Sequence, residues 1–183
     1  LVGVLGHAED GGRAYLVFEY VDGGNLEDRL KEAGPLPWPV VVELGCQLLE
    51  GLAHAHAAGV VHRDLKPANL LVSSTGMLKI GDFGVAKQQG AATLTRAGSM
   101  VGTPMYMSPE MAAGRPVTAR GDLYTVGVIL RELLTGRNPF FSDQMATTIG
   151  FILGGGIPTL FAENPCVPAA LDDVVERLMD RAP

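Results

Sequence analysis

The stretch HRDLKPANLLV, residues 62–72, decides the fold of this chain and carries most of its chemistry. A second short stretch, GDFG, follows at residues 81–84. Between the two, the β-forming runs LLVSS and MLKIGDF flank the turn residues Ser73–Gly76, which predict a small hairpin. The polar residues of both stretches are therefore expected to lie close to regular structure and to one another.

These polar residues are of the types that phosphoryl transfer requires. The transferred phosphate is already electrophilic, so a protein mainly positions groups and neutralises charge. Such a site needs a carboxylate that orients the attacking hydroxyl and accepts its proton, a cation near the phosphate, and oxygen ligands for Mg²⁺. The four candidates for these roles are the base Asp64, the cation Lys66 and the metal ligands Asn69 and Asp82.

The rest of the chain predicts a mostly helical structure with one or two small hairpins. Residues 87–101 are rich in Gly, Ala, Thr and Ser without periodicity, which predicts a long loop of the kind that is usually functional. The other predicted elements are a hairpin of residues 1–5 and 15–20 around the turn Glu9–Gly12, a helix capped by Asn25 and stopped by Gly34, a long helix over 37–58, and helices over 122–135, 142–153 and 168–181.

Composition excludes several classes of function. The chain has 183 residues and a net charge of −6, and an acidic balance argues against binding to nucleic acid or to an anionic membrane surface. Two cysteines, Cys46 and Cys166, cannot form a framework of several disulfides and favour a reducing compartment. No apolar run reaches the roughly 20 residues that span a bilayer. We expect a cytoplasmic segment without membrane contact, any membrane anchor of the parent protein lying outside it.

The order of the motifs resembles the eukaryotic-type (Hanks-type) serine/threonine protein kinase family, in its bacterial form, over essentially all 183 residues. GTPMYMSPE, residues 102–110, is similar to the end of the activation segment of these kinases. GDLYTVGVILRELLTGRNPF, residues 121–140, resembles the buried central helix of their large lobe, and YLVFEYVDGGNL, residues 15–26, resembles the strand and hinge between lobes. The resemblance implies an α+β, protein-kinase-like fold with a dominant helical lobe.

The resemblance also implies a partial domain. Residues 1–19 would be the end of the small lobe, 20–24 the hinge, and 25–183 a large lobe incomplete at its C-terminus. In the family, three parts precede these segments: the Gly-rich phosphate loop, the strand lysine and its partner glutamate. The strands that normally pair with the hairpin also precede it, so its sheet edge would be uncovered. We therefore expect residues 1–183 to be truncated at both ends and, alone, to lack appreciable kinase activity.

Site residues follow from the resemblance one by one. Asp64 would be the catalytic base, Lys66 would contact the γ-phosphate, and Asn69 and Asp82 would bind Mg²⁺, with Mn²⁺ as an alternative ion. His62 and Phe83 would belong to a packed column beneath the site, and Asp122 would hold the backbone of the catalytic loop. The cofactor-binding set for ATP comprises Phe18 as gatekeeper, the backbone of Glu19 and Val21, Asn25 just after the hinge, the floor residue Leu71, and Asp82.

Regulation is expected in the loop that precedes GTPMYMSPE. Arg63 comes directly before Asp64, and kinases with this arrangement are often switched on when a loop phosphate is clamped by that arginine. The regulatory candidates are Arg63, a second cation Lys87, the phosphorylation site Thr95 with Ser99 and Thr93 behind it, and Thr103, which would hydrogen-bond Asp64 and Lys66.

Two other functions stay open. A pseudokinase-type scaffold would have the kinase shape without transfer, although every catalytic residue that can be checked is present. A small-molecule phosphotransferase would share the catalytic loop, but such enzymes generally lack a segment like residues 102–110. His54, His56 and Cys46 fit no metal pattern and are assigned core or surface roles. The protein substrate and dimerisation are left undetermined, and Asn25 gives no support for a preference for basic substrates.

Overall fold

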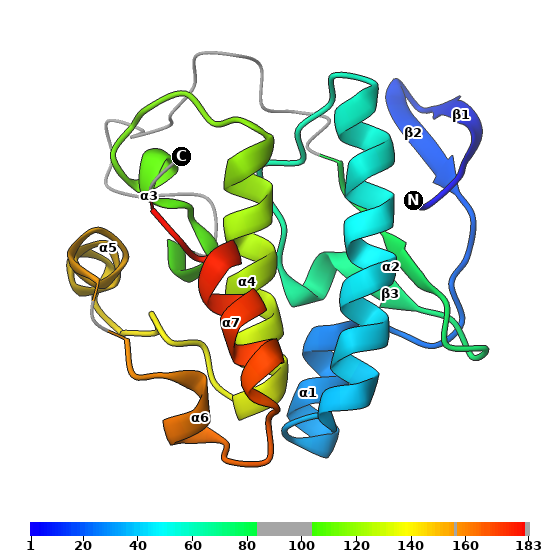
Figure 1. Ribbon diagram of the computed structural model, residues 1–183. Coiled ribbons are helices and arrows are strands. Elements are labelled where there is room, and N and C mark those ends of the chain that lie inside the picture. Colours follow the sequence, from blue (N-terminus) through cyan, green and yellow to red (C-terminus); the bar gives the residue numbers. More distant parts are fainter. Residues whose placement is uncertain (84–103, 156, 182–183) are drawn as a thin grey trace.

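A computed structural model describes residues 1–83, 104–155 and 157–181 of the chain (Figure 1). Two small antiparallel hairpins lie at one side of a helical body in this described part. The two predicted hairpins and all of the predicted helices are present, but the bounds of the first hairpin were wrong: Glu9 and Asp10, predicted in the turn, pair with Ala14 and Arg13 within the strands. In chain order the elements are β1 Val4–Asp10, β2 Arg13–Phe18, α1 Leu26–Ala33, α2 Trp38–Ala57, the 3₁₀ turn Pro67–Asn69, β3 Leu70–Val72, β4 Leu78–Ile80, the 3₁₀ turn Pro104–Tyr106, α3 Pro109–Ala112, α4 Ala119–Thr135, α5 Met145–Gly154, α6 Leu160–Glu163 and α7 Ala169–Leu178.

The first hairpin turns through two glycines. Gly11 and Gly12 have φ angles of 55° and 77°, a pair of left-handed conformations that suits a two-residue hairpin loop. The strands pair from Asp10 with Arg13 to Val4 with Phe18. Nearly all of their side chains are exposed to solvent. The backbone ladder therefore holds this hairpin, and its apolar side chains contribute little burial.

The first helix begins and ends as its sequence predicts. The Asn25 side chain accepts a hydrogen bond from the Asp28 backbone N–H, and Gly34 ends the helix with φ of 71°. Lys31 and Glu27 form an ion pair one turn apart, with 2.9 Å between Nζ and Oε2. Capping by Asn25 matters for the site because α1 follows the predicted hinge directly.

Helix α4 is the centre of the core. Every residue from Tyr124 to Leu134 is buried, and helices α2 and α7 pack on it (Figure 1). Two glycines permit close contact: a Cβ at Gly45 of α2 would lie 3.1 Å from Leu130, and one at Gly127 of α4 would lie 2.6 Å from the Met179 side chain. The core therefore fixes α2, α4 and α7 as one unit.

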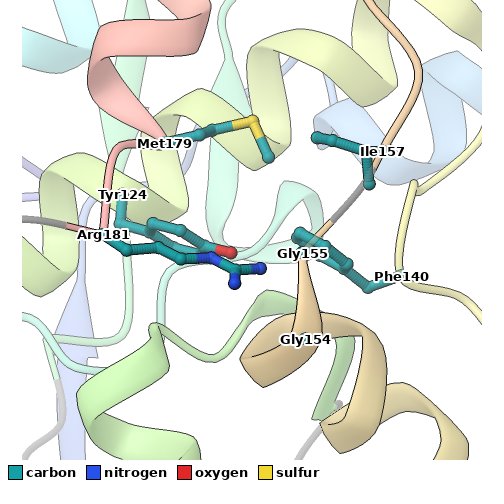
Figure 2. A pocket seen from close by; sticks show the side chains of 7 residues that line it. All are labelled: Tyr124, Phe140, Gly154, Gly155, Ile157, Met179 and Arg181. Atoms are coloured by element: carbon teal, nitrogen blue, oxygen red, sulfur yellow. The ribbon is translucent and has the colours of Figure 1, made fainter.

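A hollow of about 390 Å³ lies between α4, α5 and the end of α7 (Figure 2). None of the predicted site residues lines it; its wall consists of Tyr124, Phe140, Gly154, Gly155, Ile157, Met179 and Arg181. Arg181 donates hydrogen bonds to the carbonyl oxygens of Phe151 and Leu153. The guanidinium thus closes the C-terminal end of α5, where carbonyl groups lack partners within the helix.

Cys46 and Cys166 are free thiols on the surface. Among residues 1–83, 104–155 and 157–181, no helix combines the length and the apolar character needed to cross a bilayer.

Candidate active site

The second hairpin brings the two polar stretches together. Leu70 pairs with Ile80, and the Gly81 N–H donates to the Asn69 carbonyl over 2.8 Å. Asn69 directly precedes β3 and Asp82 comes two residues after β4, so both lie at the same open end of this hairpin. A pair of residues separated in the sequence by a turn thus becomes neighbours through antiparallel pairing.

His62 ties the same two stretches from beneath. Its Nε2 lies 2.9 Å from the Gly81 carbonyl oxygen, which can only accept, and its Nδ1 accepts from the Asp64 backbone N–H at 3.3 Å. The ring packs against Phe83 with 4.6 Å between the centroids. Because His62 is buried and both ring nitrogens are engaged, it supports the site and is not available as a proton acceptor.

Asp64, Lys66 and Asn69 are directly connected. Lys66 Nζ lies 3.4 Å from Asp64 Oδ2, and Asn69 Nδ2 donates to the Asp64 carbonyl oxygen over 2.9 Å. The use of Nδ2 turns the Asn69 amide so that Oδ1 is the atom left to bind a cation. The side chains of Asp64 and Lys66 keep 34% and 26% of their surface exposed, so a substrate can reach them.

Two residues of the site adopt a backbone conformation that residues other than glycine rarely adopt. Arg63 and Asp82 have φ angles of 67° and 48°, the left-handed region that costs a non-glycine residue about 1–3 kcal/mol. Both residues lie at the predicted site, since Arg63 directly precedes Asp64 and Asp82 is a predicted metal ligand. Strain of this kind persists only where the surroundings impose it.

Asp122 at the start of α4 imposes that conformation on the catalytic loop. Its Oδ2 accepts from the His62 N–H at 2.8 Å and its Oδ1 accepts from the Arg63 N–H at 3.0 Å. The expectation that Asp122 holds the backbone of this loop is confirmed by these hydrogen bonds. Sequence reasoning missed a third partner, His56, whose Nε2 lies 2.8 Å from Asp122 Oδ2. A signal was present, because His56 follows the buried Leu52 by four residues and shares its face of α2.

The oxygen donors fit a hard divalent cation. In the described residues, no group of three or more His, Cys, Asp or Glu side chains could hold a metal. Mg²⁺ is usually held by only one or two protein ligands together with water and substrate phosphates. Asn69 Oδ1 and the exposed Asp82 carboxylate, both at the open end of the hairpin, match that simpler ligand set.

The predicted hinge runs beside β3. Val72 donates its N–H to the Gly24 carbonyl at 2.9 Å, and Leu71 forms a bridge with Asn25. A Cβ at Gly23 would lie 2.1 Å from the Val72 carbonyl oxygen, so only glycine fits there. This contact places Leu71, the predicted floor residue, next to the hinge.

The other predicted cofactor-binding residues differ in how exposed they are and in the contacts that their side chains make. Phe18 ends β2 with 41% of its surface exposed, and Val21 is half-buried. Glu19 accepts from Lys79 Nζ at 2.9 Å and from the Gly3 N–H, and the hydrogen bond from Lys79 is the main reason that the pKa of its carboxyl is lowered. In Asn25, Oδ1 and Nδ2 both bond to Asp28, so this side chain serves the helix cap.

A buried polar cluster anchors the segment that follows Thr103. Thr125 Oγ1 of α4 donates to the Tyr106 carbonyl at 2.9 Å, and the Tyr106 side chain hydrogen-bonds Glu132. Asn138 Nδ2 also donates to Glu132, over 3.2 Å. Burial raises the pKa of the Glu132 carboxyl, and the hydrogen bonds from Tyr106 and Asn138 offset that rise only in part. Helix α4 therefore supports the catalytic loop at one end and residues 104–106 along its length.

The regulatory candidates fall mostly outside the described residues. Lys87, Thr95, Ser99 and Thr103 belong to residues 84–103, for which the structure gives no description. Arg63 is described, and its buried Nε has no hydrogen-bond partner within the described part of the chain.

Comparisons with known proteins identify the family to which the chain is similar. The sequence model of the protein kinase domain matches residues 1–164. The serine/threonine-protein kinase PknL of Mycobacterium tuberculosis is 40% identical over 100% of this chain and 46% of its own length. The probable serine/threonine-protein kinase PknB of Lactococcus lactis is 39% identical over 96% of this chain and 28% of its own length. The probable kinase pknA2 of Bifidobacterium longum is 38% identical over 100% of this chain and 25% of its own length.

The chain thus spans less than half the length of these bacterial relatives. The family model covers the two polar stretches, the hairpin between them and the buried helix α4. Both the expected fold class and the expected family are confirmed: the chain belongs to the protein kinase domain family, and the three relatives named above are bacterial.

Proposed function

We propose that this chain is the catalytic part of a serine/threonine protein kinase. It would transfer the γ-phosphate of ATP to serine or threonine hydroxyls of proteins. The observation that carries the proposal is the connection of Asp64, Lys66 and Asn69 to the Gly81–Asp82 segment through His62 and the second hairpin. Because phosphoryl transfer depends mainly on positioning and charge, such a connected set of groups is what the reaction needs.

Each group has a distinct role in the transfer. The substrate hydroxyl attacks the γ-phosphorus as the bond to the bridging oxygen of ADP breaks, and Asp64 accepts the hydroxyl proton. Lys66, beside Asp64, stabilises the negative charge of the phosphoryl oxygens. Asn69 and Asp82 would hold Mg²⁺, which neutralises phosphate charge when it is bound. Mn²⁺, another hard cation, would suit the same oxygen ligands.

ATP would bind beside the hinge, against residues 18–21 and the Leu71 side chain of β3. The backbone of Glu19 and Val21 would pair with the adenine edge, Leu71 would form its floor, and Phe18 would lie behind it. The contacts of residues 23–25 with Leu71 and Val72 support this arrangement. In the same proposal residues 1–19 form the end of a small lobe, 20–24 the hinge, and 25–183 the large lobe.

Serine and threonine are the proposed acceptors for two reasons. Lys66-Pro67 and the Gly-Thr-Pro sequence at 102–104 are similar to the serine/threonine version of these motifs. The relatives that match the full chain are also named serine/threonine-protein kinases. Activation would follow phosphorylation of Thr95, with Ser99 and Thr93 as alternatives, and the phosphate would be clamped by Arg63 and Lys87. The buried Nε of Arg63, which has no hydrogen-bond partner among the residues that the structure describes, supports that clamp.

The test uses the full-length product of the gene with radiolabelled ATP, Mg²⁺ and a mixture of protein substrates. We expect phosphoserine and phosphothreonine in the wild type and a rate at least roughly 100-fold lower in Asp64→Asn, because the general base is lost. The exposed Asp173→Asn is the matched control and should keep the wild-type rate.

Phosphopeptide mapping of the same wild-type sample checks the regulatory part, with phosphate expected on Thr95. Phosphate absent from Thr93, Thr95 and Ser99 in active protein would contradict that part alone. A wild type that binds ATP without transfer would instead favour the scaffold function. A full rate in Asp64→Asn would overturn the assignment of the base.

A further inference from the structure

The predicted hinge is connected to the turn of the second hairpin by two residues that the proposed chemistry does not use. Asp22 Oδ1 accepts from the Ser74 backbone N–H at 2.8 Å, and Asp22 Oδ2 accepts from the Ser74 hydroxyl at 2.7 Å. Asp22 lies between β2 and α1, and Ser74 lies between β3 and β4, 52 positions further along the chain. In Figure 1 the chain passes β3 on its way from β2 to α1.

The contact uses both oxygens of the Asp22 carboxylate, which gives it a defined geometry. The hydrogen bond from the Ser74 hydroxyl, and then the one from the Ser74 N–H, lower the pKa of the Asp22 carboxyl. The carboxylate is therefore ionised at neutral pH, and hydrogen bonds to a charged acceptor are stronger than those between neutral groups. Because both residues are exposed, water competes for the contact, and its main effect is on the local position of the hinge rather than on the stability of the fold.

The turn that carries Ser74 is also held by α2. Gln47 Oε1 accepts from the Leu78 N–H at 2.8 Å, and Gln47 Nε2 donates to the Gly76 carbonyl oxygen at 3.3 Å. The next residue of α2, Leu48, is buried in the core. Because α2 belongs to the core, the turn is a fixed support, and the contact with Ser74 attaches the hinge to that support.

The hinge needs such an attachment because two glycines follow Asp22. Glycine loses more conformational freedom on ordering than any other residue, so Gly23 and Gly24 make this part of the backbone costly to order. Gly24 has φ of 76°, and its carbonyl oxygen accepts from the Val72 N–H at 2.9 Å. Asp22 also directly follows Val21, whose backbone is proposed to pair with the adenine edge. The side-chain contact of Asp22 therefore restricts the backbone one residue away from the proposed adenine contact.

We propose that Asp22 and Ser74 are positioning residues of the nucleotide site. Their contact holds the hinge against the hairpin β3–β4, whose open end carries the proposed metal ligands Asn69 and Asp82. The backbone that binds adenine and the groups that bind the metal thus keep a fixed separation before ATP arrives. Such pre-ordering raises affinity, because less conformational freedom is lost on binding. The consequence for ATP rests on the proposed kinase function, whereas the attachment of the hinge to β3 does not depend on it.

The test compares four single variants and one double variant of the full-length product with the wild type. Asp22→Ala removes both acceptor oxygens, and Ser74→Ala removes the hydroxyl donor but keeps the N–H. Asp22→Asn keeps one oxygen as acceptor for the N–H, and its amide group can donate to the Ser74 hydroxyl oxygen. Thr75→Ala is the matched control, because the Thr75 hydroxyl bonds to the Ser73 hydroxyl within the same turn.

The first readout is hydrogen–deuterium exchange of the Val72 amide, which donates to the Gly24 carbonyl and is not altered by any variant. We expect its exchange to rise roughly threefold to tenfold in Asp22→Ala and by a smaller factor in Ser74→Ala. Asp22→Asn and Thr75→Ala should stay near the wild type. Unchanged exchange at Val72 in Asp22→Ala would overturn the proposal. So would a rise that is equally large in the amides of α4, because it would show a role in overall stability alone.

Nucleotide affinity is the second readout. With the proposed function correct, Asp22→Ala should raise the KM for ATP and the Kd for ADP roughly threefold to tenfold and change kcat by less than about twofold. The double variant Asp22→Ala/Ser74→Ala should match Asp22→Ala, since the two side chains act through one contact. Unchanged KM and Kd with faster exchange at Val72 would overturn the link from the hinge to the nucleotide. A wild type without activity would refute the proposed function, and exchange at Val72 would still decide whether the pair holds the hinge.

Discussion

The catalytic stretch and the first hairpin are both short and rich in turns, yet different forces hold them. In the catalytic stretch, buried side chains bond the backbone: His62 reaches Gly81, Asn69 reaches Asp64, and Asp122 reaches two successive N–H groups. The hairpin β1–β2 has its own backbone ladder, and its apolar side chains lie in solvent, Leu5 with 70% of its surface exposed. Order comes from a polar network in the first region and from strand pairing in the second.

This contrast indicates where substitutions should matter. In a buried polar network, removal of one member leaves the others unpaired in a medium of low dielectric, and the cost exceeds that of one hydrogen bond. On an exposed hairpin, a side chain can change without leaving any group unpaired. A substitution of similar size should therefore change the free energy of unfolding strongly near Asp64 and weakly near Leu5.

Among substitutions of polar side chains, the largest effect on stability is expected from Asp122→Ala. The substitution leaves the N–H groups of His62 and Arg63 without their acceptor, and each unpaired buried donor costs about 1–3 kcal/mol. We expect a loss of about 3 kcal/mol in the free energy of unfolding, measured by urea denaturation of the full-length product. Asp143→Ala, at an exposed position, is the control. A loss below about 1 kcal/mol would mean that the network does not stabilise this region.

The same contrast explains what the sequence could predict. Elements governed by local signals were predicted correctly: the Gly11-Gly12 turn, the Asn25 cap, and the apolar spacing of α2 and α4. The short helices α3 and α6, of four residues each, were missed because so few residues show no helical period. Their formation depends on tertiary contacts, such as those of Asp172 with the N–H groups at the start of α6.

The candidate site was predictable for a different reason. The motif order assigned proposed roles to Asp64, Lys66, Asn69 and Asp82 through family resemblance, and the hairpin signal at 73–76 was local. The contact between His56 and Asp122 could not be read from spacing, since 66 positions separate the two residues and no periodic pattern connects them. Nor did the sequence reveal that both polar atoms of Asn25 are used by Asp28.

A smaller and pH-dependent effect is expected from Glu132→Gln. Burial raises the pKa of the Glu132 carboxyl, so the folded state binds its proton more tightly than the unfolded state does. Stability should therefore fall as pH rises from about 4.5, the ordinary value, through the raised pKa. Glutamine keeps an oxygen acceptor for Asn138 and carries no charge, so this pH-dependent loss should disappear.

Urea denaturation at several pH values between 4 and 8 measures that difference. The exposed Glu43→Gln is the matched control, and its stability profile should follow the wild type. If Glu132→Gln kept the full pH-dependent loss, or lost stability equally at every pH, the buried carboxylate would not be the titrating group. Glu132 would then contribute through its hydrogen bonds alone, as the members of the catalytic network do.

The smallest effect is expected in the hairpin, from Leu5→Thr. Leu5 is largely exposed, and threonine suits a strand, so we expect a change within about 0.5 kcal/mol in the free energy of unfolding. Leu52→Ala provides the core reference, because truncation of a fully buried leucine costs about 2–5 kcal/mol. A loss of more than about 1 kcal/mol for Leu5→Thr in the full-length product would mean that another surface covers this hairpin there. The hairpin would then be held by side-chain burial as well as by its backbone ladder. It would differ from the catalytic stretch only in that its buried groups are apolar, whereas those of the catalytic stretch are polar.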